Sequence, residues 1–347
     1  MTDASAPGKL VLVGEYAVLS GAPAIVTAVD VRARVKVIAI PGTESTFFDA
    51  VSGRAFYFVI DDGTGLRWVG ERPAATGTIL EAVISSCSEH SILFHDGPSF
   101  RVSMNTDDFF THIGGRWTKL GVGSSSAALV ALVGALVDEL NLTMTQEELL
   151  AVCHSAHRRF QSGSGSGADV ATAVYGGVVA VRRGAEQETI NATPCDWPAD
   201  LLALPIWSGV SASTPELLVR FEQFQNANPD DYRRHLRHLK ALSEQACVAW
   251  TEQSVIDVLN ALAGYDDALR AFDIDAQIGI SSEPHDRIRQ LVEQHGAVYK
   301  TSGAGGGDFG LALTDSTKVL DAVRGSCRDG GFEILDKPFP AGGLVVS

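Results

Sequence analysis

Lys119-Leu-Gly-Val-Gly-Ser-Ser-Ser-Ala-Ala-Leu-Val-Ala-Leu-Val-Gly-Ala-Leu-Val-Asp-Glu-Leu140 is a glycine-rich turn that runs directly into an apolar helix. Gly121 and Gly123 accept backbone conformations that other residues avoid, and they let main-chain N–H groups approach a ligand. The serines stand where helix N-caps stand, and no proline interrupts the residues before Leu140. Free N–H groups and the helix dipole therefore predict a phosphate site above the glycines, although a plain strand-to-helix turn has the same local pattern.

The lysine of this loop precedes the glycines, which excludes a Walker A sequence, where Gly-Lys-Ser/Thr follows them. Two further stretches accompany the loop: Pro7-Gly-Lys-Leu-Val-Leu-Val-Gly-Glu-Tyr-Ala-Val-Leu19 and Lys300-Thr-Ser-Gly-Ala-Gly-Gly-Gly-Asp-Phe-Gly-Leu-Ala-Leu313. Taken in order, the three stretches resemble the three motifs of the GHMP kinases, the superfamily named for its galactose, homoserine, mevalonate and phosphomevalonate enzymes. Because they are spread over nearly the whole chain, the resemblance is a strong one, and it implies a small-molecule kinase.

The fold that this resemblance implies is α+β, with two domains and the active site in the cleft between them. It implies an N-terminal domain like ribosomal protein S5 domain 2 over residues 1–185, which carries the ATP phosphate-binding loop. A ferredoxin-like C-terminal domain is expected over residues 186–347. The residues themselves agree with α+β, because strands and helices mix without the regular βαβ rhythm of a doubly wound sheet.

Apolar periodicity and turn residues predict where the elements lie. Strand patterns occur at 9–19 with a break at Gly14-Glu15, and at 24–29, 31–37, 54–60, 99–104, 177–181 and 201–207. Helix patterns occur at 76–87, 145–160, 232–250, 255–272, 284–294 and 318–327, besides the helix that follows the glycine loop. Thr145 and Glu148 form a capping-box pattern, and Thr214 opens a helix with proline at its first position. Residues 191–200 are expected to be loop.

The composition is that of an ordinary globular protein with an acidic surface. The 347 residues carry a formal net charge of -15, and the pI is near 5.0. That charge disfavours nucleic acid or an anionic membrane as a partner, because both need a basic face, so an anionic substrate needs a local basic cluster.

No apolar run approaches the roughly 20 residues that span a bilayer, and no signal peptide precedes Pro7. Five scattered cysteines favour a reduced protein in the cytoplasm over a zinc protein. Monomer and homodimer both stay open.

At several positions, the residues of this sequence resemble those of phosphomevalonate kinases more than those of mevalonate kinases. The first motif has Tyr16 where mevalonate kinases usually have histidine, and Lys119 stands where they are typically proline-rich. Gly165-Ser-Gly-Ala-Asp-Val170 is similar to the Gly-Ser-Gly-x-Asp-Val of phosphomevalonate kinases. Trp207-Ser-Gly-Val-Ser-Ala-Ser-Thr214 resembles their Trp-x-Gly-x-x-Ala-Ser-Thr segment. The resemblance therefore implies ATP-dependent phosphorylation of (R)-5-phosphomevalonate to 5-diphosphomevalonate, a step of the mevalonate pathway of isoprenoid biosynthesis.

ATP and Mg²⁺ are the cofactors that the resemblance implies, together with a small anionic substrate. Phosphoryl transfer between two anions requires cations and directed N–H groups that hold them in line. The residues expected to be catalytic are Lys119, Asp169 and Ser125, and the Ser125 hydroxyl is the expected metal ligand. Nucleotide contacts are expected at Gly121, Val122, Gly123, Ser124, Ser125, Ser126, Gly305 and Gly306. Substrate contacts are expected at Lys9, Tyr16, Ser166, Ser211, Ser213, Thr214 and Gly303.

Each of these roles has a plainer interpretation. The serines suit helix caps, and a lysine stem or tyrosine ring often packs at the end of a sheet. Asp308, at the end of the third motif, suits a turn. His157, Arg158 and Arg159 are either anion contacts or solvated helix positions.

Asp169 matches the aspartate that is thought to act as a base toward an alcohol in mevalonate kinases. A phosphomonoester has a second pKa near 6 and is mostly a dianion at neutral pH, so it needs little help to lose a proton. With a phosphorylated acceptor, our hypothesis is that Asp169 mainly orients Lys119 or the metal shell.

Leu120 and Val210 stand where phosphomevalonate kinases usually have tyrosine and lysine or proline, so other functions stay open. One is a kinase of the same superfamily that acts on an alcohol, either mevalonate or a sugar. A second is a decarboxylase of the mevalonate pathway, whose glycine loop usually departs from this pattern. A third is a non-catalytic metabolite sensor with the same fold.

Overall fold

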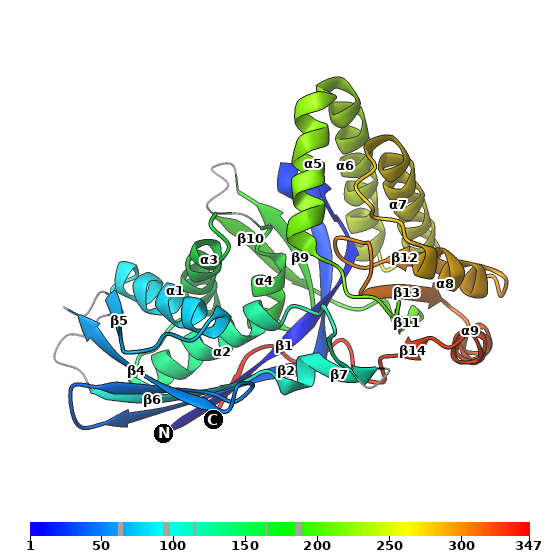
Figure 1. The fold of residues 1–347 in the computed structure, drawn as a ribbon. Coiled ribbons are helices and arrows are strands. Elements are labelled where there is room, and N and C mark those ends of the chain that lie inside the picture. The colour runs from blue at the N-terminus through cyan, green and yellow to red at the C-terminus, as the bar shows by residue number, and fades with distance from the viewer. Residues whose placement is uncertain (62–64, 93–97, 114–115, 164, 185–188) are drawn as a thin grey trace.

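The computed structural model describes residues 1–61, 65–92, 98–113, 116–163, 165–184 and 189–347. Figure 1 shows two groups of elements, each with a sheet and helices, which meet beside β1. Strands and helices mix in both groups without a repeated βαβ unit, which confirms the predicted α+β class. Among the described residues, none of the helices combines the length and the apolar character needed to cross a bilayer.

The first sheet gathers most strands of the first half of the chain. Its order is β10-β9-β2-β6-β3-β4-β5, and β1 pairs with β2 and β15. The strands are β1 (Thr2–Val13), β2 (Ala24–Ile40), β3 (Ser45–Asp49), β4 (Arg54–Asp61), β5 (Gly65–Val69), β6 (Ser99–Asn105), β9 (Val178–Arg183), β10 (Ile190–Cys195) and β15 (Val345–Val346). β2 connects the sheet, because β1, β6 and β9 all pair with it.

Helices cover one face of this sheet (Figure 1). They are α1 (Ala75–Glu89), α2 (Ser124–Glu139), α3 (Gln146–Phe160) and α4 (Ala168–Tyr175). α2 is apolar on every side because it is buried on every side: each apolar side chain from Ala127 to Leu136 is at most 1% exposed. Gly134 interrupts that run where Leu344 packs, since a methyl group there would lie 2.6 Å from a methyl carbon of Leu344.

The glycine loop is delivered by a short hairpin. β7 (Phe110–Ile113) pairs with β8 (Arg116–Lys119), so that Lys119 lies opposite Phe110 at the base of the hairpin. η1 (Ala17–Ser20) follows β1, and η2 (Asp107–Phe109) precedes β7. The loop between β8 and α2 also bonds to β1, because Lys9 N–H donates to the Val122 carbonyl at 2.9 Å. The first two motifs are therefore hydrogen-bonded to each other.

The second group contains a sheet of order β12-β13-β11-β14. Its strands are β11 (Leu202–Trp207), β12 (Val298–Thr301), β13 (Phe309–Thr314) and β14 (Glu333–Ile334). Its helices are α5 (Thr214–Ala227), α6 (Pro229–Thr251), α7 (Val255–Ala276), α8 (Glu283–Glu293) and α9 (Thr317–Asp329). In Figure 1, α5, α6 and α7 rise together, while α8 and α9 lie beside this sheet.

The predicted loop at 191–200 is wrong in its first half. β10 covers Ile190–Cys195 and pairs with β9 at the edge of the first sheet. An edge strand tolerates proline and exposed polar residues, so the sequence of β10 lacks the apolar pattern of an inner strand. β1 also begins earlier than its apolar run, because the small residues before Pro7 pair with β2.

The division of the chain at residue 185 stays a prediction. The structure shows that β10 and β15, which follow that residue, both belong to the first sheet. The last residues return to β1: Asp3 and Ser347 exchange a pair of backbone hydrogen bonds at 2.9 and 2.8 Å.

A buried ion pair ties the two groups together between the first and third motifs. Lys300 Nζ lies 2.5 Å from Glu15 Oε1, and the two side chains are 0% and 3% exposed. Gly303 N–H donates to the same oxygen at 3.4 Å. Tyr16 hydroxyl donates to the Ala304 carbonyl at 2.6 Å. Removing one partner of such a buried pair typically costs about 3–5 kcal/mol, so this contact fixes the third loop against β1.

Candidate active site

One cavity of about 840 Å³ lies where the three motifs meet. It takes its lining from β1, the glycine loop, the loop before α4, the start of α5 and the third glycine motif. The expected site residues that line it are Lys9, Tyr16, Lys119, Gly121, Gly123, Ser124, Ser125, Ser126, Ser166, Asp169, Ser211, Ser213, Thr214 and Gly303. The fold thus brings segments from both ends of the chain to a single site.

Val122, Gly305 and Gly306 are not among the residues that line this cavity. Val122 is 1% exposed, and its carbonyl accepts from Lys9 N–H. A methyl group on Gly305 would lie 2.5 Å from the Ile280 carbonyl, so this glycine permits the third loop to pack against the segment after α7. Their assignment to the nucleotide stays a prediction.

The glycine loop has the geometry of an anion cradle. Gly121 and Gly123 have φ values of +73° and +87°, in the left-handed region that favours glycine. Gly123 is the N-cap of α2, and no side chain caps that end of the helix among the described residues. The first N–H groups of a helix have no preceding turn to bond with. They and the positive end of the helix dipole lie beside Ser124 and Ser125 at the cavity wall.

Asp169 lies in the first turn of α4 with a dense set of partners. Its Oδ2 accepts from Ser126 Oγ at 2.7 Å, and its Oδ1 accepts from Val170 N–H at 2.9 Å. His157 Nε2 lies 3.5 Å from Oδ2. Burial acts to raise the pKa of Asp169, but His157, Ser126, Lys9 and the Val170 N–H outweigh it and leave the pKa below its ordinary value. Asp169 is therefore an ionised carboxylate at neutral pH.

Lys9 and Lys119 supply the positive charge of the cavity. Lys9 lies between two loops: a methyl group on Gly123 would be 3.3 Å from its Cγ, and one on Gly303 would be 3.5 Å from its Nζ. Lys9 acts to lower the pKa of both Asp169 and Asp308, and Lys119 acts to lower the pKa of Asp308 as well. Lys9 therefore lies close to Asp169, and the orientation of Lys119 or of the metal shell by Asp169 stays a prediction.

Asp308 is a second carboxylate of the cavity, which sequence reasoning assigned to a turn. Burial raises the pKa of Asp308 above its ordinary value, although the Ala212 N–H, Lys9 and Lys119 act in the opposite direction. Its φ of +55° is in the left-handed region. A methyl group on Gly121 would overlap the Asp308 carboxylate, so the third motif touches the phosphate loop here. The signal in the sequence was an aspartate at the end of a run of glycines.

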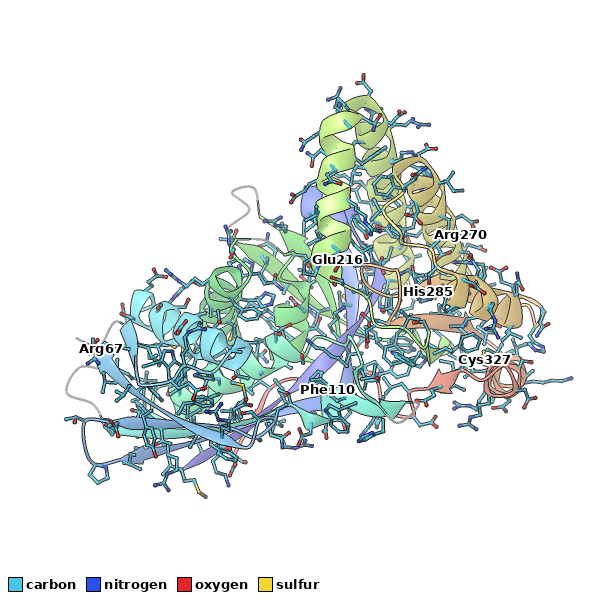
Figure 2. All side chains as sticks on the ribbon, viewed as in Figure 1. Arg67, Phe110, Glu216, Arg270, His285 and Cys327 are labelled. Carbon is cyan, nitrogen blue, oxygen red and sulfur yellow. The ribbon has the colours of Figure 1, made fainter. Side chains whose placement is uncertain are left out.

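The start of α5 forms another wall of the cavity. Ser213 is the N-cap, with no side-chain hydrogen bond to the helix among the described residues, and proline stands in the first turn as predicted. Ser211 Oγ donates to the Lys119 carbonyl at 3.0 Å, which ties this segment to the phosphate loop. Glu216, labelled in Figure 2, marks the first turn of the helix. A second anion is therefore well placed at this N-terminus.

Tyr16 and the three basic residues at the end of α3, His157, Arg158 and Arg159, have different surroundings. Burial raises the pKa of Tyr16, and its hydroxyl donates a hydrogen bond to the Ala304 carbonyl, so this side chain connects the first and third motifs. His157 lines the cavity and is 2% exposed. Arg159 pairs with Glu89, and neither Arg158 nor Arg159 lines this cavity.

The donor set fits magnesium better than a transition metal. Among the described residues, His, Cys, Asp and Glu do not form a group of three or more that could hold a metal ion. Mg²⁺ usually takes one or two protein oxygens and completes its shell with water and substrate phosphates. Ser125 and Asp169 both line the cavity, and their side chains provide a hydroxyl and carboxylate oxygens of this kind.

Comparison with known proteins finds similarity to the family that the three motifs resemble. Residues 109–177, which include the phosphate loop and Asp169, match the family described as GHMP kinases N terminal domain. The chain is 28% identical to a phosphomevalonate kinase of Streptomyces sp. strain CL190, over 91% of this chain and 90% of that protein. It is 26% identical to a mevalonate kinase of Thermococcus sibiricus, over 96% of this chain and 95% of that protein.

Solved structures share the fold over nearly the whole chain. The structure of Streptococcus pneumoniae phosphomevalonate kinase in complex with phosphomevalonate and AMPPNP covers 97% of this chain and 99% of its own, with a TM-score of 0.79 and 19% identity. The matched domain carries the phosphate loop, and the likeness extends over both halves. Residues 109–177 therefore carry the GHMP kinase N-terminal domain, and the chain as a whole has the GHMP kinase fold and is similar to GHMP kinases along nearly its full length.

Proposed function

We propose that the protein transfers the γ-phosphoryl group of ATP to (R)-5-phosphomevalonate and releases ADP and 5-diphosphomevalonate. The observation that carries the proposal is a pair of helix N-termini on one cavity, α2 after Gly123 and α5 after Ser213. Each N-terminus favours an anion. ATP requires one such site, and an acceptor that already carries a phosphate requires another.

The chemistry needs alignment and charge balance more than covalent participation by the protein. An oxygen of the acceptor phosphate forms a bond to the γ-phosphorus, and the bond from that phosphorus to the bridging oxygen of ATP breaks. In the proposal, the N–H groups around Ser124 hold the nucleotide phosphates, and Ser211 to Thr214 hold the acceptor phosphate. Lys9 and Lys119 offset the charge that both substrates bring into the cavity. Mg²⁺, held by Ser125, would neutralise part of the charge on the nucleotide phosphates.

Asp169 acts in this proposal as a fixed negative charge that keeps Lys9 and the Ser126 hydroxyl in place. Its pKa lies below the ordinary value, so it is ionised when the acceptor phosphate is a dianion. No proton has to leave such an acceptor as the new bond forms. A base at Asp169 is therefore unnecessary for this substrate.

A second candidate is phosphorylation of mevalonate itself. An ionised Asp169 can accept the proton of an alcohol, and a mevalonate kinase is among the similar proteins. In that case the N-terminus of α5 would have no phosphate to hold. The acceptor thus separates the two candidates.

The test is ADP release by the purified protein with Mg²⁺ and ATP. The acceptors, each offered separately, are 5-phosphomevalonate, mevalonate, 5-diphosphomevalonate and a set of sugars, and mass spectrometry identifies the product. We expect turnover with 5-phosphomevalonate that yields the diphosphate, a step of the mevalonate pathway in the cytoplasm. Turnover with mevalonate or a sugar alone would refute this acceptor, and CO₂ release from 5-diphosphomevalonate would indicate a decarboxylase. If none of the acceptors supports ADP release, a non-catalytic metabolite sensor is the remaining function.

Ser213→Ala/Thr214→Val tests the acceptor cradle directly. We expect the KM for 5-phosphomevalonate to rise about 100-fold, because each hydroxyl contact to a charged group contributes about 1.5 kcal/mol and the variant removes two of them. The KM for ATP should change little. Ser316→Ala, which removes the hydroxyl cap of α9 away from the cavity, is the matched control.

A further inference from the structure

Asp308 bonds to the segment that leads into α5 through both its backbone and its side chain. Its N–H donates to the Val210 carbonyl at 2.7 Å, and its carbonyl accepts from Ser208 N–H at 2.8 Å. Its Oδ1 accepts from Ala212 N–H at 3.2 Å. One residue therefore fixes alternate positions of this segment from Ser208 to Ala212.

Apolar burial cannot hold this segment in place. Val210 is 48% exposed, and Ser211, Ser213 and Thr214 are exposed as well. Hydrogen bonds therefore decide where the segment lies, and those to Asp308 are joined by the bond from Ser211 Oγ to the Lys119 carbonyl. The N-terminus of α5 starts directly after these contacts, so its direction depends on them.

Asp308 is itself held from the core of the second group. His285, labelled in Figure 2, is 1% exposed and donates from Nε2 to the Gly307 carbonyl at 2.9 Å. Its Nδ1 accepts from the Tyr299 hydroxyl at 2.7 Å. Burial lowers the pKa of His285, which agrees with a neutral ring that donates on one side and accepts on the other. The carbonyl just before Asp308 is thus anchored to β12 and α8.

The Asp308 carboxylate also contacts the glycine loop, which the proposed function assigns to ATP. A methyl group on Gly121 would overlap it, so the carboxylate occupies the space that the glycine leaves free. A bare negative charge so close to two phosphate cradles would oppose anion binding. The contact with Ala212 N–H, however, needs only an acceptor oxygen at that position.

We propose that Asp308 is a positioning residue that sets the acceptor cradle and its spacing from the ATP loop, acting through the Ala212 hydrogen bond rather than through its charge. The proposal rests on the proposed function, because the cradle is assigned there to the acceptor phosphate. It makes the third motif a determinant of acceptor binding.

Two variants separate position from charge. Asp308→Gly removes the carboxylate and tolerates a φ of +55°, so the backbone keeps its conformation. Asp308→Asn keeps an acceptor oxygen and tolerates the same region, but it removes the charge. Asp315→Ala, an exposed aspartate after β13, is the matched control.

The experiment is steady-state kinetics of the full chain with 5-phosphomevalonate and ATP, after thermal melting has confirmed folding of each variant. We expect Asp308→Gly to raise the KM for 5-phosphomevalonate at least tenfold, with less than a threefold change in the KM for ATP. Asp308→Asn should restore the acceptor KM to within about threefold of the wild type. A loss of kcat of equal size in both variants would overturn the proposal, since charge would then be the cause. An unchanged acceptor KM in Asp308→Gly would overturn it too.

Failure of the proposed function has a different signature. If the wild type turns over mevalonate and not 5-phosphomevalonate, the acceptor assignment fails before any variant is compared. Retained affinity of Asp308→Gly for a non-hydrolysable ATP analogue, measured by calorimetry, separates a displaced acceptor cradle from a damaged ATP loop. Loss of that affinity would place Asp308 with the nucleotide and contradict the inference.

Discussion

Asp169 and Asp308 are two carboxylates on one cavity whose surroundings move their pKa values in opposite directions. Asp169 accepts two hydrogen bonds and lies near His157 and Lys9, which favour its charged form. Asp308 accepts one backbone hydrogen bond, and burial dominates there. The charges and hydrogen-bond donors that face each carboxylate therefore decide the direction of its pKa shift, and the residue type does not.

The two groups also belong to different halves of the chain, yet Lys9 lowers the pKa of both. Lys9 follows the bulge of β1 at Pro7 and Gly8, so its position depends on the first motif. It is the counter-charge that the Asp169 wall and the Asp308 wall of the cavity share. The following predictions change one wall, or the lysine that they share.

The largest effect is expected from Lys9→Met. Both carboxylates would lose a counter-charge inside a cavity that has to accept phosphates. We expect kcat/KM to fall about 1,000-fold, which corresponds to about 4 kcal/mol of transition-state stabilisation. Lys36→Met, at an exposed position of β2 where the lysine pairs with Asp3, is the control and should retain activity. If kcat/KM falls less than tenfold in Lys9→Met, the Asp169 and Asp308 walls do not depend on this shared charge.

Gly121→Ala should come next, because its methyl group would overlap the Asp308 carboxylate. We expect kcat/KM to fall about 100-fold, or about 3 kcal/mol. Gly53→Ala is the control for backbone strain alone, since Gly53 has a φ of +67° and nothing within 4 Å of the added carbon. Combining Gly121→Ala with Asp308→Gly removes the collision and should recover part of the loss. Strictly additive losses would contradict a direct contact.

Asp169→Asn should have a smaller effect on a phosphorylated acceptor. Asparagine keeps an oxygen for Val170 N–H but loses the charge that faces Lys9. We expect about a tenfold loss in kcat, with residual activity that rises between pH 6 and 8 as the acceptor phosphate loses its second proton. The lowered pKa of Asp169 keeps this carboxylate ionised over that range, so the wild type should show the same acid limb. Complete loss of turnover with intact folding and substrate binding would restore the role of general base.

The smallest effect concerns stability on the Asp169 side. His154 packs against Gly167, the N-cap of α4, and burial lowers the pKa of His154 to about 4. The unfolded chain binds this proton near pH 6.5 and the folded protein does not, so stability falls as the pH drops from 6.5 toward 4. The contribution reaches at most about 3 kcal/mol.

Urea unfolding at pH 7.5 and 5 measures this slope. The wild type should lose more stability between the two pH values than His154→Gln does. His238→Gln, at an exposed position of α6, should keep the wild-type slope. An identical slope in His154→Gln would assign the pH dependence to other groups.

Local patterns in the sequence predicted much of this molecule. The capping box at Thr145 and Glu148 is present in α3, and α2 begins directly after Gly123. Proline also stands in the first turn of α5. These features depend on residues within a few positions of one another, so periodicity and capping rules apply to them.

Contacts between distant residues lay beyond those rules. The hydrogen bond from Ala212 to Asp308 joins residues 96 positions apart. His157 was one of three basic residues in a row, and nothing local distinguished the one that lines the cavity. β10 was missed because an edge strand has a weak pattern. Such features become visible only when the sheet has been assembled.

The ion pair between Glu15 and Lys300 joins residues 285 positions apart. During synthesis, Glu15 therefore emerges long before its counter-charge, and a chain that ends before β12 would have to leave this carboxylate in water. The first motif can reach its final position only after the third has been made. Formation of the cavity is thus a late event in folding, since a contact of high sequence separation has to close a long loop before it forms. A chain that ends after β10 should therefore bind neither substrate, because the third motif has not yet been made.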